Sequence, residues 1–205
     1  MLKTIIKDLA AVMRNDPAAT GITEVILTYA GFHALVLHRL AHFLYRSKCR
    51  LLARTVSQLS RFLTGIEIHP GATIGQGVFI DHGMGVVIGQ TAVVGNNVVI
   101  YQGVTLGGTG KEKGAKRHPT IGCGVMVSAG AKVLGNITIG NCSKIGANSV
   151  VLTDVPPNAT VVGIPGKVVR IDGKRVPDKD EHTLDPVMDE IDKLRARIEI
   201  LEKFN

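Results

Sequence analysis

Residues 121–151, IGCGVMVSAGAKVLGNITIGNCSKIGANSVV, decide the fold, because an aliphatic residue returns there at every sixth position. The repeating positions are Ile121, Val127, Val133, Ile139, Ile145 and Val151. One inward aliphatic per six residues predicts a short strand and a turn in each step, so that three steps make one turn of a three-sided coil. The sequence therefore predicts a solenoid built from hexapeptide repeats.

The same six-residue step runs through the preceding residues with two interruptions. Going outward, the aliphatic positions are Leu106, Ile100, Val94 and Ile88, followed by Ile80, Ile74 and Ile68. The register slips by nine residues between Leu106 and Ile121, and by two residues between Ile80 and Ile88. We call residues 81–85 the first break and residues 107–118 the second break. Chemically reactive side chains are concentrated in these two segments.

The composition fits this fold. Of 205 residues, 24 are glycine and only 4% are aromatic, which is typical of closely stacked backbone turns filled by aliphatic side chains. A hydrophobic fraction of 45% allows one main domain with appendages. The net charge of +7 favours an anionic partner such as a phosphate, a nucleotide or a nucleic acid.

The cysteines and the hydropathy indicate the compartment. Cys49, Cys123 and Cys142 are odd in number and lack CxxC spacing, so neither a disulfide framework nor a zinc site is predicted. The sequence contains no signal-peptide pattern and no run of 18 apolar residues. We therefore expect a reduced, cytoplasmic protein that does not span a membrane.

The residues before the coil have helical apolar spacing. Residues 1–14 predict an amphipathic helix that ends before Pro17, because a proline excludes the helical conformation from the residue that precedes it. Residues 24–63 predict two helices with a break near residues 47–49. A helical cap on the coil is the simplest interpretation, with binding to a membrane surface or a nucleic acid as alternatives.

Two further patterns lie outside the breaks. His38 and His42, with His33 nearby, have a spacing that a metal site would use, but no carboxylate motif accompanies them, and packed histidines are favoured. After a polar linker at residues 172–180, a heptad stripe predicts a helix that forms a coiled coil or packs on its own chain. Its apolar positions are Leu184, Val187, Ile191, Leu194, Ile198 and Leu201. The predicted domains are thus residues 1–65, 66–170 and 171–205.

Each break contains candidate catalytic residues. In the first, His82 is flanked by Asp81 and Gly83, and an imidazole is the side chain best suited to accept a proton near neutral pH. Glu67 precedes His82 by 15 residues, nearly one turn of the coil, so its carboxylate could orient the ring. A solvated corner turn is the alternative.

The second break is a glycine-rich loop that ends in Lys116, Arg117 and His118. The planar guanidinium of Arg117 matches a carboxylate or a phosphate. The GxxxxGK[ST] pattern of nucleotide-binding loops is absent. A solvated basic loop without a ligand is the alternative.

Several motifs resemble those of the serine O-acetyltransferases, over residues 16–169. They are Glu67-Ile-His-Pro, Ile80-Asp-His-Gly with Gly85, Gln102-Gly-Val-Thr-Leu-Gly-Gly-Thr-Gly, Arg117-His-Pro, Gly124-Val-Met, Ala129-Gly-Ala-Lys-Val-Leu-Gly-Asn and Val155-Pro-Pro. The resemblance implies a mainly β fold, a left-handed parallel β-helix with an N-terminal α-helical region, to which the heptad stripe adds a C-terminal helix. It also implies acetyl transfer from acetyl-CoA to L-serine in cysteine biosynthesis, with no metal.

The resemblance assigns roles to residues by their position. His82 would be the general base, oriented by Glu67 where the family often has aspartate. Asp16 and Asp81 would hold the serine ammonium, and Arg117 its carboxylate. His118 would contact the substrate or the transition state. The acetyl-CoA groove would be lined by Gly108, Thr109, Ala129, Ala147 and Lys167. Attack would be direct, in a ternary complex.

The resemblance also concerns assembly. The family's site lies between neighbouring prisms of a trimer, and the longer members carry additional N-terminal helices that pair two trimers. About 65 residues precede the coil here, so we expect a homotrimer. The chain ends Lys203-Phe204-Asn205 rather than in isoleucine, so we do not expect a tight complex with O-acetylserine sulfhydrylase.

Three other functions remain as alternatives at this point. Homoserine, a sugar or an antibiotic could replace serine as the acceptor. A metal-dependent hydratase resembling γ-class carbonic anhydrases would need His69, His82 and His118 to converge. A non-catalytic scaffold would leave both breaks without a chemical role.

Overall fold

The computed structural model describes residues 2–110, 114–176, 194 and 197–198. The chain forms two compact units, Met1–Arg175 and Val176–Asn205. Of the predicted heptad residues, only Leu194 and Ile198 are described; both are helical and about half exposed. The other heptad positions lie outside the described residues.

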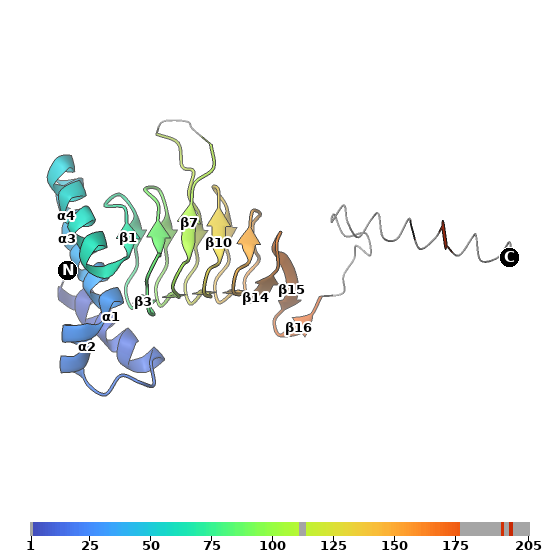
Figure 1. Cartoon of the computed structure of the whole chain (residues 1–205), viewed down its shortest axis with the longest axis horizontal. Coiled ribbons are helices and arrows are strands. Elements are labelled where there is room, and N and C mark those ends of the chain that lie inside the picture. Colours follow the sequence, from blue (N-terminus) through green and yellow to red (C-terminus); the bar gives the residue numbers. More distant parts are fainter. Residues whose placement is uncertain (1, 111–113, 177–193, 195–196, 199–205) are drawn as a thin grey trace. The chain divides into compact units, whose positions relative to one another are not determined.

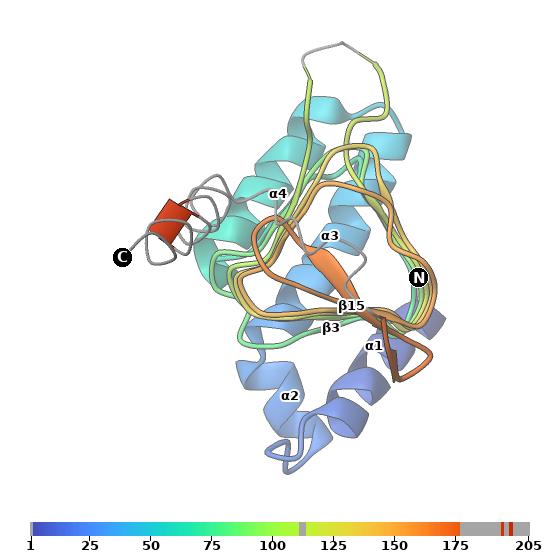
Figure 2. The ribbon, with the colours of Figure 1, turned by 90° about the vertical axis from the view of Figure 1, so that its right-hand side faces the viewer.

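The hexapeptide repeat forms a three-sided coil of short parallel strands. The strands are β1 (Glu67–Ile68), β2 (Thr73–Ile74), β3 (Phe79–Ile80), β4 (Val87–Ile88), β5 (Val93–Val94), β6 (Val99–Ile100), β7 (Thr105–Gly107), β8 (Thr120–Ile121), β9 (Met126–Val127), β10 (Lys132–Leu134), β11 (Thr138–Ile139), β12 (Lys144–Ile145) and β13 (Val150–Val151). Each strand from β1 to β10 pairs in parallel with the third strand after it. This confirms the predicted three steps per turn, and Figure 2 shows the triangular outline along the coil.

Three sheets form the sides of the coil. The first sheet has the order β1-β4-β7-β10-β13, the second β11-β8-β5-β2, and the third continues from β3, β6, β9 and β12 into the C-terminal strands. The aliphatic repeat residues point inward and are buried along the whole length. Burial of these side chains, at about 25 cal/mol per Å² of apolar surface, is the main stabilising contribution to the coil.

The register continues across both breaks. Ile88 aligns with Ile68, and Ile121 aligns with Val94, although extra residues lie between them in the sequence. A stacked strand that slipped by one residue would turn its aliphatic outward, so the extra residues are extruded at corners instead. The coil thus presents both breaks on its surface without interrupting its core.

Corner glycines allow successive turns to stack closely. At Gly122, a Cβ atom would lie 2.8 Å from the backbone nitrogen of Asn141 and 2.9 Å from the carbonyl oxygen of Ile139. Those distances are too short for any side chain, so glycine is required here by the neighbouring turn rather than by its own dihedral angles.

Four helices cover the N-terminal end of the coil (Figure 1): α1 (Leu2–Asn15), α2 (Ile22–Thr28), α3 (Ala30–Arg46) and α4 (Arg50–Thr64). The predicted first helix and the predicted break near residues 47–49 are confirmed. The two helices expected over residues 24–63 are three, because the chain is extended at Tyr29 between α2 and α3. At Gly31 the start of α3 approaches the backbone of Ile80 so closely that no Cβ would fit.

A buried ion pair fastens α1 and α3 to the coil. Arg39 Nη2 donates to Asp8 Oδ2 at 3.0 Å, and the Asp8 side chain is 1% exposed. The other carboxylate oxygen accepts the backbone N–H of Gly77 at 2.7 Å, and Arg39 also donates to the carbonyls of Ile74 and Gly75. Because both partners also bind the turn at residues 74–78, the pair fixes two helices against one corner.

The coil ends in antiparallel strands. A polar linker was expected from residue 172; instead β14 (Ala159–Val162) turns back into β15 (Lys167–Ile171), which pairs with β16 (Lys174–Arg175). Pro165 and Gly166 lie in the reversal, where they suit a tight turn. Among the described residues, no helix is long and apolar enough to cross a bilayer.

Candidate functional site

The first break is a tight corner between β3 and β4. The backbone N–H of Asp81 still donates to Ile100 O at 2.8 Å, and the chain then turns at His82, whose φ is 56°. Positive φ is uncommon for a residue other than glycine, but other corners of this coil share it, as at Asn97 and Asn148. Gly83 N–H closes the corner by donating to Asp81 O at 2.6 Å. His82 is therefore held by backbone contacts while its side chain is exposed.

Asp16 reaches the first break from the loop that follows α1. Its carboxylate accepts the hydroxyl of Tyr29 at 2.7 Å and the backbone N–H of Ala18 at 2.8 Å. These two bonds lower the pKa of Asp16 below its ordinary 3.8, and the nearby His82 acts in the same direction. The bond to Asp16 raises the pKa of Tyr29 to about 12, with a smaller contribution from the charge of Asp81. The predicted residues Asp16, Asp81 and His82 are thus neighbours.

Glu67 lies on β1, beside the same corner. Its Oε2 atom forms an ion pair with Arg61 Nη1 at 3.1 Å, and within the described residues no hydrogen bond joins Glu67 to His82. The backbones that carry Glu67 and His82 are nevertheless close together. The residue before Glu67, Ile66, places its side chain where a Cβ on Gly83, the residue after His82, would lie. Orientation of His82 by Glu67 stays a prediction.

The described parts of the second break, residues 107–110 and 114–118, lead away from the coil between β7 and β8 (Figure 1). Its base is closed by a bond from Thr109 N–H to Arg117 O at 3.2 Å. Arg117 is exposed, whereas His118 is only 5% exposed and its Nδ1 atom lies 2.8 Å from Thr91 Oγ1. Burial lowers the pKa of His118, and the charges of Arg117 and Lys116 lower it further.

The two breaks lie along the two long edges of the first sheet: the first break is on the edge where its strands begin, and the second is on the edge where its strands end. His82 lies at the corner between β3 and β4, while His118 packs on Gly89 at the corner between β4 and β5. Strand β4 therefore separates them. Within one chain, the structure unites Asp16, Asp81 and His82 on one edge, and Arg117 with His118 on the other.

The residues predicted to bind acetyl-CoA divide in the same way. Ala129 and Ala147 lie on successive turns above His82, and Ala129 O accepts the backbone N–H of Asn148 at 2.9 Å. Lys167 begins β15, beyond the last turn of that corner. Gly108 and Thr109 lie on the opposite edge, with Arg117 and His118. These two sets flank the outer face of the first sheet.

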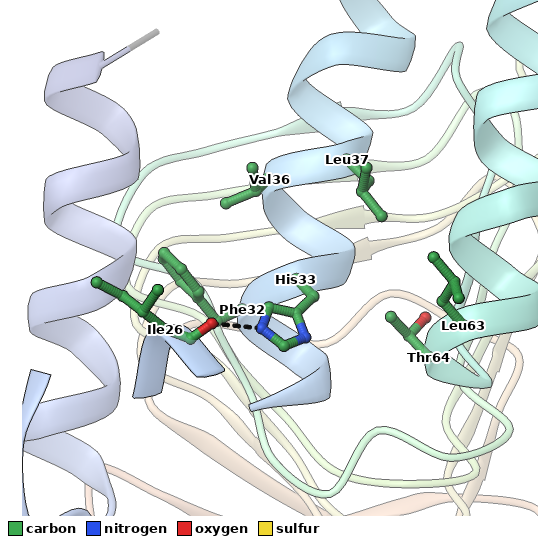
Figure 3. A pocket seen from close by; sticks show the side chains of 7 residues that line it. All are labelled: Ile26, Phe32, His33, Val36, Leu37, Leu63 and Thr64. Atoms are coloured by element: carbon green, nitrogen blue, oxygen red, sulfur yellow. Dashed lines mark hydrogen bonds between the residues drawn. The ribbon is translucent and has the colours of Figure 1, made fainter. Parts of the chain in front are cut away.

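A separate apolar hollow of about 390 Å³ lies among α2, α3 and α4 (Figure 3). Its lining is Ile26, Phe32, His33, Val36, Leu37, Leu63 and Thr64. His33 Nε2 is bonded to Ile26 O at 2.7 Å. None of the predicted site residues lines this hollow, so it is distinct from the candidate site.

The histidines of helix α3 are packed or half-buried, as predicted. His38 is 3% exposed, burial lowers its pKa to about 3, and His42 Nδ1 bonds Pro70 O at 2.8 Å. His69 Nδ1 accepts the N–H of Gly71 at 2.9 Å. In the part of the chain that the structure describes, no group of three His, Cys, Asp or Glu side chains could hold a metal ion.

Sequence reasoning missed three residues that contact predicted ones: Tyr29, Arg61 and Thr91. Tyr29 bonds Asp16, Arg61 pairs with Glu67, and Thr91 bonds His118. None lies in a break of the register, and each meets its partner only through folding. The sequence alone contains no signal that would single them out.

Comparison with known proteins identifies the family. Residues 1–36 match the model of the serine acetyltransferase N-terminal region, and residues 118–153 match that of the bacterial transferase hexapeptide (six repeats). The serine acetyltransferase of Bacillus subtilis (strain 168) is 61% identical over 194 residues, which cover 94% of this chain and 89% of that protein.

Two solved structures are similar over most of the chain. Neisseria gonorrhoeae serine acetyltransferase in complex with serine has a TM-score of 0.79 at 46% identity, covering 82% of this chain and 69% of that one. Brucella abortus strain S19 serine acetyltransferase in complex with coenzyme A has a TM-score of 0.80 at 47% identity, covering 82% and 67%. With identity this high over nearly its whole length, the chain belongs to the serine acetyltransferase family.

Proposed function

We propose that this protein transfers an acetyl group from acetyl-CoA to the hydroxyl of L-serine, giving O-acetylserine and CoA. The observation that carries the proposal is the convergence of Asp16 with Asp81 and His82 in a chain of this family. The serine and coenzyme A complexes of its relatives support both substrates. Its place is cysteine biosynthesis, in the cytoplasm, where the cysteines stay reduced.

Binding of serine rests on charge complementarity. Asp16 remains ionised throughout the neutral range, because Tyr29 and the Ala18 amide lower its pKa. With Asp81 it offers two carboxylates to the serine ammonium. Arg117 has the fork geometry for the serine carboxylate. A sugar would not engage this set of charges.

The reaction follows from the exposed imidazole. His82 removes the proton from the serine hydroxyl as its oxygen attacks the thioester carbonyl of acetyl-CoA. Backbone donors, including the Gly108 amide, stabilise the oxyanion of the tetrahedral intermediate. The C–S bond then breaks, the CoA thiolate leaves, and the imidazolium of His82 returns its proton to the sulfur. Glu67 orients His82, and the ion pair with Arg61 limits where its carboxylate can lie.

Assembly completes the site in this proposal. Because His82 and His118 lie on opposite edges of the first sheet, one copy supplies Asp16, Asp81 and His82, and the next supplies Arg117 and His118. A homotrimer of left-handed β-helices closes such a ring with three equivalent interfaces. Acetyl-CoA lies along the groove between copies, contacting Ala129, Ala147 and Lys167 of one copy and Gly108 and Thr109 of the next.

In this proposal, each predicted domain contributes a different part of the active site or of the fold. Residues 66–170 form the acetyltransferase domain, and residues 1–65 supply Asp16. Residues 171–175 complete β15 and β16 at the end of the coil, so the boundary of the predicted C-terminal segment moves to residue 176.

The test is the release of CoA thiol from acetyl-CoA with L-serine, with homoserine, and with no acceptor. We expect serine-dependent release that is lost in His82→Ala. Absence of turnover with serine would refute the proposal, and faster turnover with homoserine would change the acceptor. Incubation with acetyl-CoA alone, followed by mass spectrometry, should give no acetylated enzyme if attack is direct.

A further inference from the structure

Thr91 is the main anchor of the returning arm of the second break. It lies half-buried between β4 and β5 and binds three consecutive residues. Its hydroxyl oxygen accepts the backbone N–H of Arg117 at 3.1 Å and that of His118 at 3.2 Å. Its carbonyl accepts Lys116 Nζ at 3.1 Å, and the same ammonium binds His118 O at 2.9 Å. The segment is therefore held by one residue of the preceding turn.

Thr91 also decides which nitrogen of His118 carries the proton. His118 Nδ1 faces the backbone N–H of Thr91 at 3.2 Å and the Thr91 hydroxyl at 2.8 Å. A backbone N–H can only donate, so Nδ1 must accept. The hydroxyl oxygen already accepts two amide hydrogens, which leaves its own hydrogen for Nδ1. With Nδ1 occupied as an acceptor, neutral His118 carries its proton on Nε2.

The Nε2 side of the His118 ring packs against Gly89 and Gly108. A Cβ on Gly89 would overlap the Cδ2 and Nε2 atoms of His118, and a Cβ on Gly108 would lie 3.0 Å from Nε2. Two positions without side chains thus leave room for the ring. Protonation at Nδ1 would set a hydrogen against the Thr91 amide hydrogen. Burial, followed by the charges of Arg117 and Lys116, lowers the pKa of the ring and so opposes a second proton.

We propose that Thr91 is a positioning residue that holds His118 as the neutral Nε2–H tautomer, so that His118 donates a hydrogen bond to an anionic oxygen of the reacting pair and does not act as a second base. The inference rests on the proposed function for the identity of that oxygen, which is the serine carboxylate or the oxyanion of the intermediate. The two histidines of the site then have fixed and different tasks: His82 accepts a proton, and His118 donates a hydrogen bond.

The first test reads the tautomer without any turnover. Nitrogen-15 correlation spectra of the wild-type protein, with His118 assigned by its loss in His118→Asn, should show a protonated Nε2 and an unprotonated Nδ1 near neutral pH. An Nδ1–H tautomer or an imidazolium there would overturn the inference. This measurement stands even if wild-type protein fails to acetylate serine, which would refute the proposed function alone.

The second test compares Thr91→Val, which removes the hydroxyl but keeps the shape, with Thr91→Ser, which keeps the hydroxyl. We expect kcat/KM for serine to fall about 10- to 100-fold in Thr91→Val, because a misplaced donor loses transition-state stabilisation, and to recover within about threefold in Thr91→Ser. A higher KM would assign the oxygen to the serine carboxylate, and a lower kcat to the oxyanion. Equal activity of Thr91→Val and wild type, or equal loss in both variants, would contradict the proposal.

A third comparison separates a donor from a base. The amide nitrogen of His118→Gln lies near the position of Nε2, whereas that of His118→Asn lies near Nδ1. We expect His118→Gln to keep at least tenfold more activity than His118→Asn. Equal inactivity of the two would indicate a proton acceptor, and would overturn the assignment even if Thr91→Val does not fold.

Discussion

The first and second breaks are both insertions into the hexapeptide repeat, but they hold their histidines in different ways. In the first break, His82 is exposed and is held through backbone contacts at a corner with positive φ. In the second, His118 is nearly buried and its ring, amide and carbonyl all have partners. A general base must reach a solvent-accessible substrate and change its protonation state, so it cannot be tightly enclosed. A hydrogen-bond donor works best when its proton is fixed.

The breaks also differ in their source of partners. The first receives Asp16 and Tyr29 from the helical region, while the second is held by Thr91 from the coil itself. A short insertion of two residues cannot build a pocket alone, and the helices supply what it lacks. The longer insertion folds back on the preceding turn. Four experiments test this contrast.

The largest effect is expected from removing the base. His82→Ala should lower kcat by about 10² to 10⁴-fold, the usual contribution of a general base, while the unfolding midpoint changes little because the side chain is exposed. Thiol release and thermal unfolding measure the two quantities. His42→Asn, on helix α3, is the matched control and should remain active. A fully active His82→Ala would remove the distinction between the breaks.

Mixing two inactive variants tests whether the breaks meet between chains. His82→Ala and Arg117→Gln should each be inactive, but refolded mixtures should regain about a quarter of the wild-type rate, because one interface in four then has both residues intact. The rise over the His82→Ala parent should be about 25- to 2,500-fold. The same mixture measured without subunit exchange serves as the control. Mixtures as inactive as the parents would indicate that both breaks act within one chain.

The Asp8–Arg39 ion pair fastens to the coil the helical region that supplies Asp16 to the first break, and its contribution to the free energy of unfolding can be measured. Asp8→Ala leaves Arg39 buried without its partner and should destabilise the protein by about 3–5 kcal/mol in urea unfolding at fixed protein concentration. Lys7→Ala, at an exposed position on the same helix, should change stability by less than about 0.5 kcal/mol. If Asp8→Ala were as stable as Lys7→Ala, the ion pair of Asp8 and Arg39 would not hold α1 on the coil.

The smallest effect is expected at Tyr29. Tyr29→Phe removes the donor that lowers the pKa of Asp16, so that pKa should rise toward 3.8, and KM for serine should increase about two- to tenfold as the carboxylate loses its position. In wild type, the stabilising effect of ionised Asp16 is present above pH 3.8 and is lost as pH falls through the lower folded pKa. Because the folded pKa of Asp16 lies closer to 3.8 in Tyr29→Phe, the loss should be smaller and should be complete at a higher pH. Tyr45→Phe is the control, since Tyr45 bonds Gln90 instead. Identical curves would argue against the bond.

Most of the fold follows from local periodicity. Each six-residue step predicts its own strand and turn, because its inward aliphatic side chain must be buried wherever the step occurs. The helices are predicted in the same way from the spacing of their apolar residues. The extension at Tyr29 and the hairpin of β14 and β15 escaped prediction, since each depends on what the segment packs against. Asp81-His82 and Arg117-His118 were identifiable because they interrupt the period.

The sequence by itself determined the repeat, its two interruptions and the residues within them. Only the tertiary structure decided that the breaks fall on opposite edges of one sheet, that Tyr29 meets Asp16, and that Thr91 fixes the proton of His118. The physical reason is the range of the interactions. Periodic burial is encoded within a few residues, whereas a hydrogen bond between stacked turns, or between a helix and a corner, joins residues that become neighbours only when the whole coil has closed.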